Sequence, residues 1–533
     1  MPRCGSVDIE EASIDDLQEH MTRGRFSARE LTECYLKRIT RVNRYTKSVI
    51  EVNPMATEIA NSLDHERRRG GVRGKLHGIP FLVKDNIATK DQMETTAGSS
   101  MLIGTIVPED AHVVALLRDA GAILLGHANM SEWACMRSTS EGYSSRGGQG
   151  RNPYNLAENP GGSSSGSAGA VACNMCVFSL GTETDGSILF PADRNGVVGI
   201  KPTVSLTSRR GLVPAASSLD TLGPLSRSVA DAAIVLGTIA EYDLQDRSTA
   251  KWLRPTSAFF EPCLRKQTAL KGVSFGLPAK RVWEAAASNP DVKYEYRALR
   301  FVAEQIRGAG AEVLEGTDFP SWEELVPPDG WDWDYGAKIG HPEHSEFTVV
   351  KVEFYNEIKK YLQTLGNNKN NILSLEKIVE YNRNHTATEG GLAGTHPAWP
   401  KGQDNFEMSL DSEGIEDDTY TAALEYIQFQ SRIMGIDGAL ASGGRLLDGL
   451  LVPILADGGV ACQVAAKAGY PMISIPVGVN DTGVPFGIGI IQSAWREDLL
   501  IKYGSAIEDL IRGRRSPTFL NPDADNYMYV GNP

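Results

Sequence analysis

The sequence contains little cysteine, has no excess of positive charge and lacks any long apolar run. Its seven cysteines are odd in number and scattered, which does not suit the disulfide framework of a small secreted protein. The formal net charge is −14, and no stretch gathers Lys and Arg into the basic face that nucleic acid requires. No segment approaches the roughly 18 apolar residues of a membrane span. We therefore expect a cytoplasmic protein that binds neither nucleic acid nor membrane.

Two short motifs that could bind a metal ion lack the rest of a site. Cys173 and Cys176 form a C-x-x-C, but no second pair lies nearby and both fall in an apolar run of small residues. Buried thiols one helical turn apart are the simpler interpretation. His341 and His344 also have a suitable spacing, yet no third ligand is evident near them. We expect neither a metal nor an organic cofactor.

The chain of 533 residues is long for one domain, but large α/β enzymes often form a single unit of this size. Short apolar runs, such as residues 79–83 and 122–126, alternate with helical patterns, such as residues 112–120. This alternation predicts a single α/β domain spanning residues 1–533. Its expected parts are N-terminal helices (8–70), a catalytic core (76–235), insertions and helices that shape the substrate pocket (240–420), and the C-terminal part of the core (421–515), with strands near 472–476 and 486–491 and a last helix near 497–512.

The Gly- and Ser-rich stretch 161–167 is the most unusual part of the sequence. A phosphate-binding loop is a poor interpretation, because the G-K-[ST] ending that neutralises phosphate is absent. The letters also satisfy G-x-S-x-G, the nucleophile elbow, which would select Ser164. That elbow must follow a buried strand, whereas residues 152–160 are polar and turn-forming. The remaining alternative is a flexible linker.

Lys84 ends the apolar run 79–83, where a charged side chain would be costly to bury. Such a lysine either becomes neutral, and then can act as a base, or pairs with a carboxylate such as the neighbouring Asp85. Both alternatives stay open on the local sequence. A further candidate, Ser187, lies in the segment 181–188, 24 residues after Ser163.

Together these segments resemble the amidase signature family. The resemblance rests on motifs in the same order and spacing, namely G-I-P-F-L-V-K-D-N (78–86), G-G-S-S (161–164), the step of 24 residues to the second serine, G-I-K-P-T (199–203), A-G-Y-P (468–471), I-P-V-G (475–478) and G-V-P-F-G-I (483–488). It covers residues 27–515. It implies an α/β fold in which a mixed β-sheet core is sandwiched between helices.

The resemblance also implies a Ser–cis-Ser–Lys triad. Ser187 matches the acylating nucleophile, Ser163 matches the serine that follows a cis peptide bond, and Lys84 matches the base. The backbone N–H groups of Thr184, Asp185, Gly186 and Ser187 would form the oxyanion hole. A serine hydroxyl needs such a base because it is a weak nucleophile at neutral pH.

Two positions depart from the commonest family pattern. Asp185 stands where many members have Gly, which leaves the backbone donors in place. Leu189 stands where many have Arg, so an acidic substrate is less expected. The Asp185 form, with R-G-G-Q (146–149), R-N-P-Y (151–154) and G-Q-D-x-F-E (402–407), is most similar to the peptide amidases, which hydrolyse C-terminal carboxamides of peptides.

The expected partner is therefore a small-molecule or peptide amide, and the expected assembly is a monomer or homodimer. Within the same fold, the alternative is the glutaminase (A) subunit of a tRNA-dependent amidotransferase. Trp331, Trp333 and Tyr335 either line a substrate entrance or pack an insertion against the core.

Overall fold

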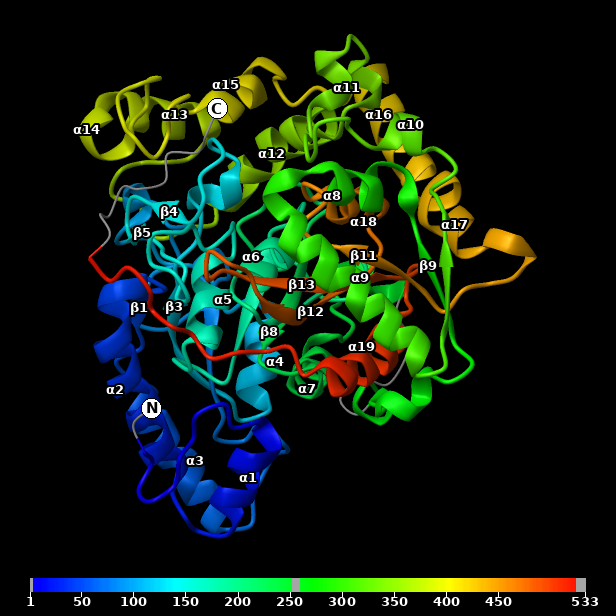
Figure 1. The fold of residues 1–533 in the computed structure, drawn as a ribbon. Coiled ribbons are helices and arrows are strands. Elements are labelled where there is room, and N and C mark those ends of the chain that lie inside the picture. The colour runs from blue at the N-terminus through cyan, green and yellow to red at the C-terminus, as the bar shows by residue number, and fades with distance from the viewer. Residues whose placement is uncertain (1–2, 252–258, 524–533) are drawn as a thin grey trace.

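A mixed sheet of eleven strands forms the centre of the computed structural model, which describes residues 3–251 and 259–523 (Figure 1). The strand order is β1-β3-β2-β6-β8-β7-β12-β13-β11-β9-β10. The strands are β1 (Val49–Val52), β2 (Pro80–Lys84), β3 (Ile123–Ala128), β6 (Phe178–Glu183), β7 (Val198–Lys201), β8 (Thr221–Ser226), β9 (Ser274–Leu277), β10 (Glu312–Glu315), β11 (Gly449–Pro453), β12 (Met472–Val479) and β13 (Pro485–Ile491). A separate small hairpin pairs β4 (Tyr143–Ser144) with β5 (Gly148–Gln149).

Helices flank this sheet, which confirms the predicted α/β class. The larger ones are α1 (Ile14–Thr22), α2 (Ala28–Thr46), α3 (Ala56–Arg68), α4 (His112–Asp119), α5 (Ser165–Ala172), α6 (Leu189–Arg194), α7 (Val229–Ile239), α9 (Lys293–Gly308), α12 (Glu346–Leu362), α13 (Leu375–Asn384), α15 (Asp404–Asp411), α16 (Asp418–Ser431), α18 (Val460–Ala468) and α19 (Glu497–Ile511). The shorter ones are α8 (Glu284–Ser288), α10 (Trp322–Leu325), α11 (Tyr335–Lys338), α14 (Thr386–Glu389) and α17 (Gly438–Leu440). No helix within the described ranges is both long and apolar enough to cross a membrane.

The N-terminal region differs from the prediction in one element. Helix α2 begins with a capping box, in which Ser27 Oγ accepts from the N–H of Glu30 while the Glu30 carboxylate accepts from the N–H of Ser27. Residues 8–70 are not all helical, however, because β1 lies among them and pairs antiparallel with β3. A run of four residues between two helices is too short to show the alternation of apolar and polar residues that predicts a strand.

The region 240–420 is likewise more than a set of insertions and helices. It supplies β9 and β10, which continue the sheet in parallel beyond β11. Helices α10 to α16, which we call the cap, gather at one end of the molecule, at the top of Figure 1, while α1 and α3 lie at the opposite end. The cap therefore gathers at one end of the molecule, whereas β9 and β10 belong to the sheet.

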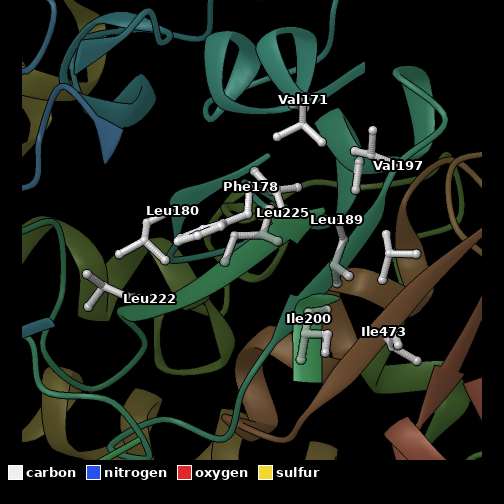
Figure 2. Close-up of a cluster of buried hydrophobic side chains, with 14 of the residues drawn as sticks. Val171, Phe178, Leu180, Leu189, Val197, Ile200, Leu222, Leu225 and Ile473 are labelled. Atoms are coloured by element: carbon white, nitrogen blue, oxygen red, sulfur yellow. The ribbon is translucent and has the colours of Figure 1, made fainter. Parts of the chain in front are cut away.

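The apolar core lies directly beneath the strands that carry the catalytic candidates. Phe178 and Leu180 of β6 share one face of the sheet with Leu222 of β8 (Figure 2). Ile200 of β7 lies on that face as well, whereas Leu225 of β8 packs on the opposite face. All five side chains are buried. Fully burying a side chain of this kind stabilises the folded state by about 1.5–3 kcal/mol. These buried side chains therefore hold the ends of these strands firmly in place.

Candidate active site

Lys84 is the last residue of β2, and the sheet register brings it to the end of β6. The two strands are parallel, with Phe81 opposite Phe178 and Val83 opposite Leu180. Their carboxyl ends therefore meet at the same edge of the sheet. There Lys84 Nζ lies 2.9 Å from Thr182 Oγ1 and 3.1 Å from the Thr182 carbonyl oxygen.

The side chain of Lys84 is completely buried, and its third contact is Ser163 Oγ at 2.7 Å. Burial lowers the pKa of Lys84 to about 7, because the charged amine loses its hydration. A substantial fraction of this amine is therefore neutral at physiological pH, and a neutral amine can accept a proton from Ser163.

Pairing of Lys84 with Asp85, the alternative that the local sequence left open, does not occur. The Asp85 carboxylate points to other groups: it accepts from the hydroxyl of Thr96 and the N–H of Gly98, and its Oδ1 lies 2.7 Å from His127 Nδ1. Asp85 lies in the turn directly after β2, and these partners occupy its carboxylate in place of Lys84.

Ser163 follows a cis peptide bond from Gly162, in agreement with the family resemblance. Its carbonyl oxygen accepts from the N–H of Ser131 at 3.0 Å, and its side chain is fully buried. Gly162 cannot be replaced without movement, because a Cβ there would lie 2.4 Å from Ser131 Oγ. The Gly- and Ser-rich stretch is thus a tightly packed segment and not a flexible linker.

Ser164, the serine that a nucleophile-elbow search selects, has its hydroxyl occupied. Ser164 Oγ donates to the Thr182 carbonyl at 3.1 Å, and the side chain is buried at the start of α5. The N–H of Ser164 donates to the carbonyl oxygen of Ser187 at 3.1 Å. This backbone bond holds Ser187 beside the residue that follows Ser163, so the structure brings Lys84, Ser163 and Ser187 into one region.

Ser187 lies in the turn between β6 and α6, with 8% of its surface exposed. The turn depends on Gly186, whose φ of +73° is accessible to glycine and whose Cβ, if present, would lie 2.6 Å from the Phe190 ring. The N–H of Phe190 donates to the Gly186 carbonyl at 2.8 Å. The segment 184–187, which we call the oxyanion segment, is therefore tightly constrained at its glycine.

Two buried carboxylates support the oxyanion segment from its flanks. Glu183 Oε2 accepts from the N–H groups of Ile188 and Leu189 at 2.6 and 3.0 Å, and the N–H of Gly186 also faces this carboxylate. On the other flank Thr184 Oγ1 donates to Asp220 Oδ1 at 2.6 Å. Burial raises the pKa of Glu183 and raises that of Asp220 to about 6. No local sequence pattern marks Asp220, which lies 36 residues from Thr184.

The cap reaches the oxyanion segment through Trp331, whose Nε1 donates to Asp185 Oδ2 at 2.7 Å. Trp333 stacks on Phe347 at 4.8 Å, which is packing against the core. Trp333 and Tyr335 also line a cavity of about 270 Å³. Trp331 and Trp333 thus make packing contacts, which is one of the two alternatives for this aromatic group. Because Trp333 and Tyr335 line this cavity, a substrate entrance beside these two residues stays a prediction.

The two possible metal motifs do not gain ligands in the fold. His341 and His344 stack on each other at 5.1 Å, and His344 stacks on Tyr426 at 3.8 Å. Cys173 and Cys176 are fully buried. Within residues 3–251 and 259–523, no group of three or more His, Cys, Asp or Glu side chains is arranged to hold a metal ion.

Comparison of the chain with known proteins identifies its family. The Amidase family model matches residues 30–341. A Schizosaccharomyces pombe protein that is named as an amidase is 49% identical over 99% of this chain and 90% of its own length. The solved peptide amidase of Stenotrophomonas maltophilia superposes with a TM-score of 0.83 and 38% identity, covering 96% of this chain and 99% of that one.

A third relative has a different role. A glutamyl-tRNA(Gln) amidotransferase subunit of Synechococcus is 30% identical over 93% of this chain and 97% of its own length. The chain belongs to the amidase family. It is a hydrolase that acts on amides.

Proposed function

We propose that the chain hydrolyses linear or aryl amides through an acyl-enzyme on Ser187, with Ser163 and Lys84 as its proton relay. The observation that carries this proposal is the 2.7 Å contact between Lys84 Nζ and Ser163 Oγ in a fully buried site. It gives a buried amine with a pKa of about 7 direct access to one serine, and the Ser164–Ser187 backbone bond holds the second serine beside it.

In the first half-reaction, Ser187 Oγ attacks the amide carbonyl carbon. Its proton passes to Ser163 Oγ while the proton of Ser163 passes to Lys84 Nζ, so that the relay ends as an ammonium group. The backbone N–H groups of the oxyanion segment other than that of Gly186, which faces Glu183, would stabilise the oxyanion. One such donor is typically worth about 3–4 kcal/mol. The C–N bond then breaks, and the proton returns through Ser163 to the leaving ammonia or amine.

In the second half-reaction, water attacks the acyl-enzyme ester. One proton of the water passes through the same relay to Lys84, and its oxygen bonds to the acyl carbon. Collapse of the oxyanion releases the carboxylic acid, and the proton on Lys84 returns to Ser187 Oγ through Ser163. The cycle uses side chains of this chain and water alone.

The substrate class that we favour is the C-terminal amide of peptides. The likeness to the peptide amidase of Stenotrophomonas maltophilia, over nearly the whole of both chains, supports this choice. We place the activity in the cytoplasm, since all seven cysteines are free and five of them are buried. The enzyme would act as a monomer or homodimer on a small-molecule or peptide amide.

Labelling with a fluorophosphonate probe, combined with ammonia release from a panel of peptide, fatty and aryl amides, tests this proposal. Wild type should label, and Ser187→Ala should not. Ser164→Ala is the matched control, because that hydroxyl is bonded to Thr182 and should not be needed for labelling. Labelling lost in Ser164→Ala but kept in Ser187→Ala would remove the assignment of the nucleophile.

The second candidate is the glutaminase component of a tRNA-dependent amidotransferase, which the Synechococcus likeness favours. That role requires partner subunits. Glutaminase activity measured alone and with the other amidotransferase subunits and glutamate-charged tRNA separates the two. Hydrolysis of peptide amides by the isolated chain supports the first proposal, whereas activity on glutamine only with partners would replace it.

A further inference from the structure

Asp185 contacts two residues of the cap region that lie far away in the sequence. Its Oδ2 accepts from Trp331 Nε1 at 2.7 Å, and its carboxyl group lies beside that of Glu346, the first residue of α12. Glu346 is 1% exposed and Asp185 is 8% exposed. Two carboxyl groups therefore meet out of water, directly beside the oxyanion segment.

The remaining oxygens of this pair have no conventional donor. Within the described ranges, Asp185 Oδ1 and Glu346 Oε1 are both buried and accept from no N–H or hydroxyl group. Glu346 Oε2 accepts from Gln463 Nε2 at 3.2 Å. Two adjacent carboxylates cannot both be charged at low cost, and an orphaned buried acceptor is costly as well. A single proton held between the two carboxyl groups removes both costs.

The charge of the surroundings fits a pair that carries one proton. Lys467 of α18 is 7% exposed and lies close enough to both carboxyl groups to interact with them electrostatically. Burial lowers the pKa of Lys467, and the neighbouring carboxyl groups raise it. In its ammonium form Lys467 neutralises the charge of −1 that a singly protonated pair carries. Either full protonation or full ionisation of the pair would leave an unbalanced buried charge.

Asp185 is the member that holds the proton. Glu346 begins a helix of 17 residues, accepts from Gln463 and faces Lys467, and each of these stabilises a negative charge. Asp185 faces Glu346 and Glu183, which both disfavour a charge on it, and burial and these neighbours raise the pKa of Asp185 well above its usual range. Protonated, Asp185 donates to Glu346 and accepts from Trp331, so both of its oxygens are bonded.

We propose that Asp185 acts as a neutral carboxylic acid that donates to Glu346, and that this pair positions the oxyanion segment against the cap for reaction. The inference rests on the proposed function, since the segment matters through Ser187 and the N–H groups that surround it. Loss of the shared proton at alkaline pH places two carboxylates in contact, and the segment then moves away from α12. Activity should therefore fall on the alkaline side.

Other titratable groups face this pair from the elements packed around it, and each could shape the same pH range. They are Glu183 of β6, Lys201 of β7, Asp332 in the segment before α11, and Cys462 and Lys467 of α18. A test must change the pair itself and leave these five groups in place.

Replacing either carboxyl group of the pair by an amide changes the pair and leaves the other five titratable groups in place. The side-chain amide introduced by Asp185→Asn can donate to Glu346 and accept from Trp331 as the protonated acid does, but it has no proton to lose. We expect this variant to label with the fluorophosphonate probe faster at neutral pH than Asp185→Ala does, and to lack the alkaline fall. Glu346→Gln should also lose the alkaline fall. Asp185→Ala, which removes both hydrogen bonds, should label at least about tenfold more slowly than wild type.

Glu508→Gln is the matched control, because Glu508 is a half-buried carboxylate that accepts from the N–H of Val229 in the contact between α19 and α7. It should keep the alkaline fall. Three results would overturn the inference: a wild-type rate that stays constant up to about pH 10, an unchanged alkaline fall in both Asp185→Asn and Glu346→Gln, or an Asp185→Asn variant as slow as Asp185→Ala. Melting temperatures identify any variant that fails to fold. If one of the two amide variants fails to fold, the pH profile of the other amide variant tests the inference.

The proton can also be detected without activity. The infrared difference spectrum between wild type and Asp185→Asn should contain the carbonyl band of a protonated, buried carboxylic acid at neutral pH. Absence of that band contradicts the inference even if the enzyme is active. A band in a protein that neither labels nor hydrolyses amides would instead support the pair and contradict the proposed function.

Discussion

Lys84 Nζ lies 2.7 Å from Ser163 Oγ, and neither side chain is accessible to solvent. Strand β2 and the turn before α5 deliver these two groups from positions 79 residues apart. The energetic cost of burying the amine is what makes it a base, since burial favours the neutral form that can accept a proton.

The first prediction concerns pH. With a Lys84 pKa of about 7, kcat/KM should rise as pH increases through about 7, because the amine must lose its proton before it can accept one. Lys84→Met should lower kcat/KM by about 10²- to 10⁴-fold and remove this inflection. The measurement is kcat/KM from about pH 5 to about pH 9.

Lys201→Met serves as its control, because Lys201 is also buried and its Nζ donates to the Tyr470 carbonyl at 2.7 Å. That variant should keep the inflection near pH 7, whatever its plateau. An inflection that survives in Lys84→Met would remove Lys84 as the base.

A second prediction compares two glycines with the same backbone angle. Gly186 and Gly148 both have a φ of +73°, but a Cβ at Gly186 would lie 2.6 Å from the Phe190 ring, whereas nothing lies within 4 Å at Gly148. Gly148→Ala should cost only the left-handed strain of about 1–2 kcal/mol and keep its activity. Gly186→Ala should lower the melting temperature further and abolish most of kcat. Equal behaviour of the two variants would contradict the role given to this glycine in the turn.

The third prediction concerns Glu183, which accepts from the N–H groups of Ile188 and Leu189. Glu183→Ala leaves both donors buried without an acceptor, which costs about 1–3 kcal/mol for each group. Urea denaturation should show a loss of about 2–6 kcal/mol in the free energy of unfolding, together with a lower kcat. Glu183→Gln keeps a carbonyl oxygen and should lose less. A stability unchanged in Glu183→Ala would show that the carboxylate does not hold the turn.

The fourth prediction concerns the C-x-x-C motif. Burial raises the pKa values of Cys173 and Cys176 to about 12, so neither forms a reactive thiolate in the folded protein. Neither should react with iodoacetamide at about pH 8 unless urea is present, as peptide mass mapping would show. The purified protein should also contain no stoichiometric zinc. Fast alkylation of either residue in the native state would reopen a redox role.

Much of the sheet could be predicted from local sequence. The runs 79–83, 122–126 and 486–491 are apolar and correspond to β2, β3 and β13, because strands buried on both faces have continuous apolar sequences. The final helix near 497–512 corresponds to α19. In contrast, β1, β9 and β10 have four residues each, and only the sheet they join identifies them as strands.

The same division holds at the site. Lys84, Ser163 and Ser187 occur in motifs whose order and spacing are visible in the sequence. The residues that support this triad do not occur in such motifs. Asp220, Trp331 and Glu346 contact the oxyanion segment from 36 to 161 residues away in the sequence, and no local pattern marks them. The possible pair of Lys84 with Asp85 does not form, because Asp85 begins the turn after β2 and tertiary contacts decide the partners of both side chains.

The order of strands in the sheet also bears on how the protein is made. Strands β12 and β13 stand between β7 and β11, so the middle of the sheet comes from residues 472–491. A chain emerging from the ribosome without them has two unpaired edges, one on β7 and one on β11, and such edges favour aggregation. Synthesis must therefore be nearly complete before β7 and β11 gain their neighbours and the two parts of the sheet join.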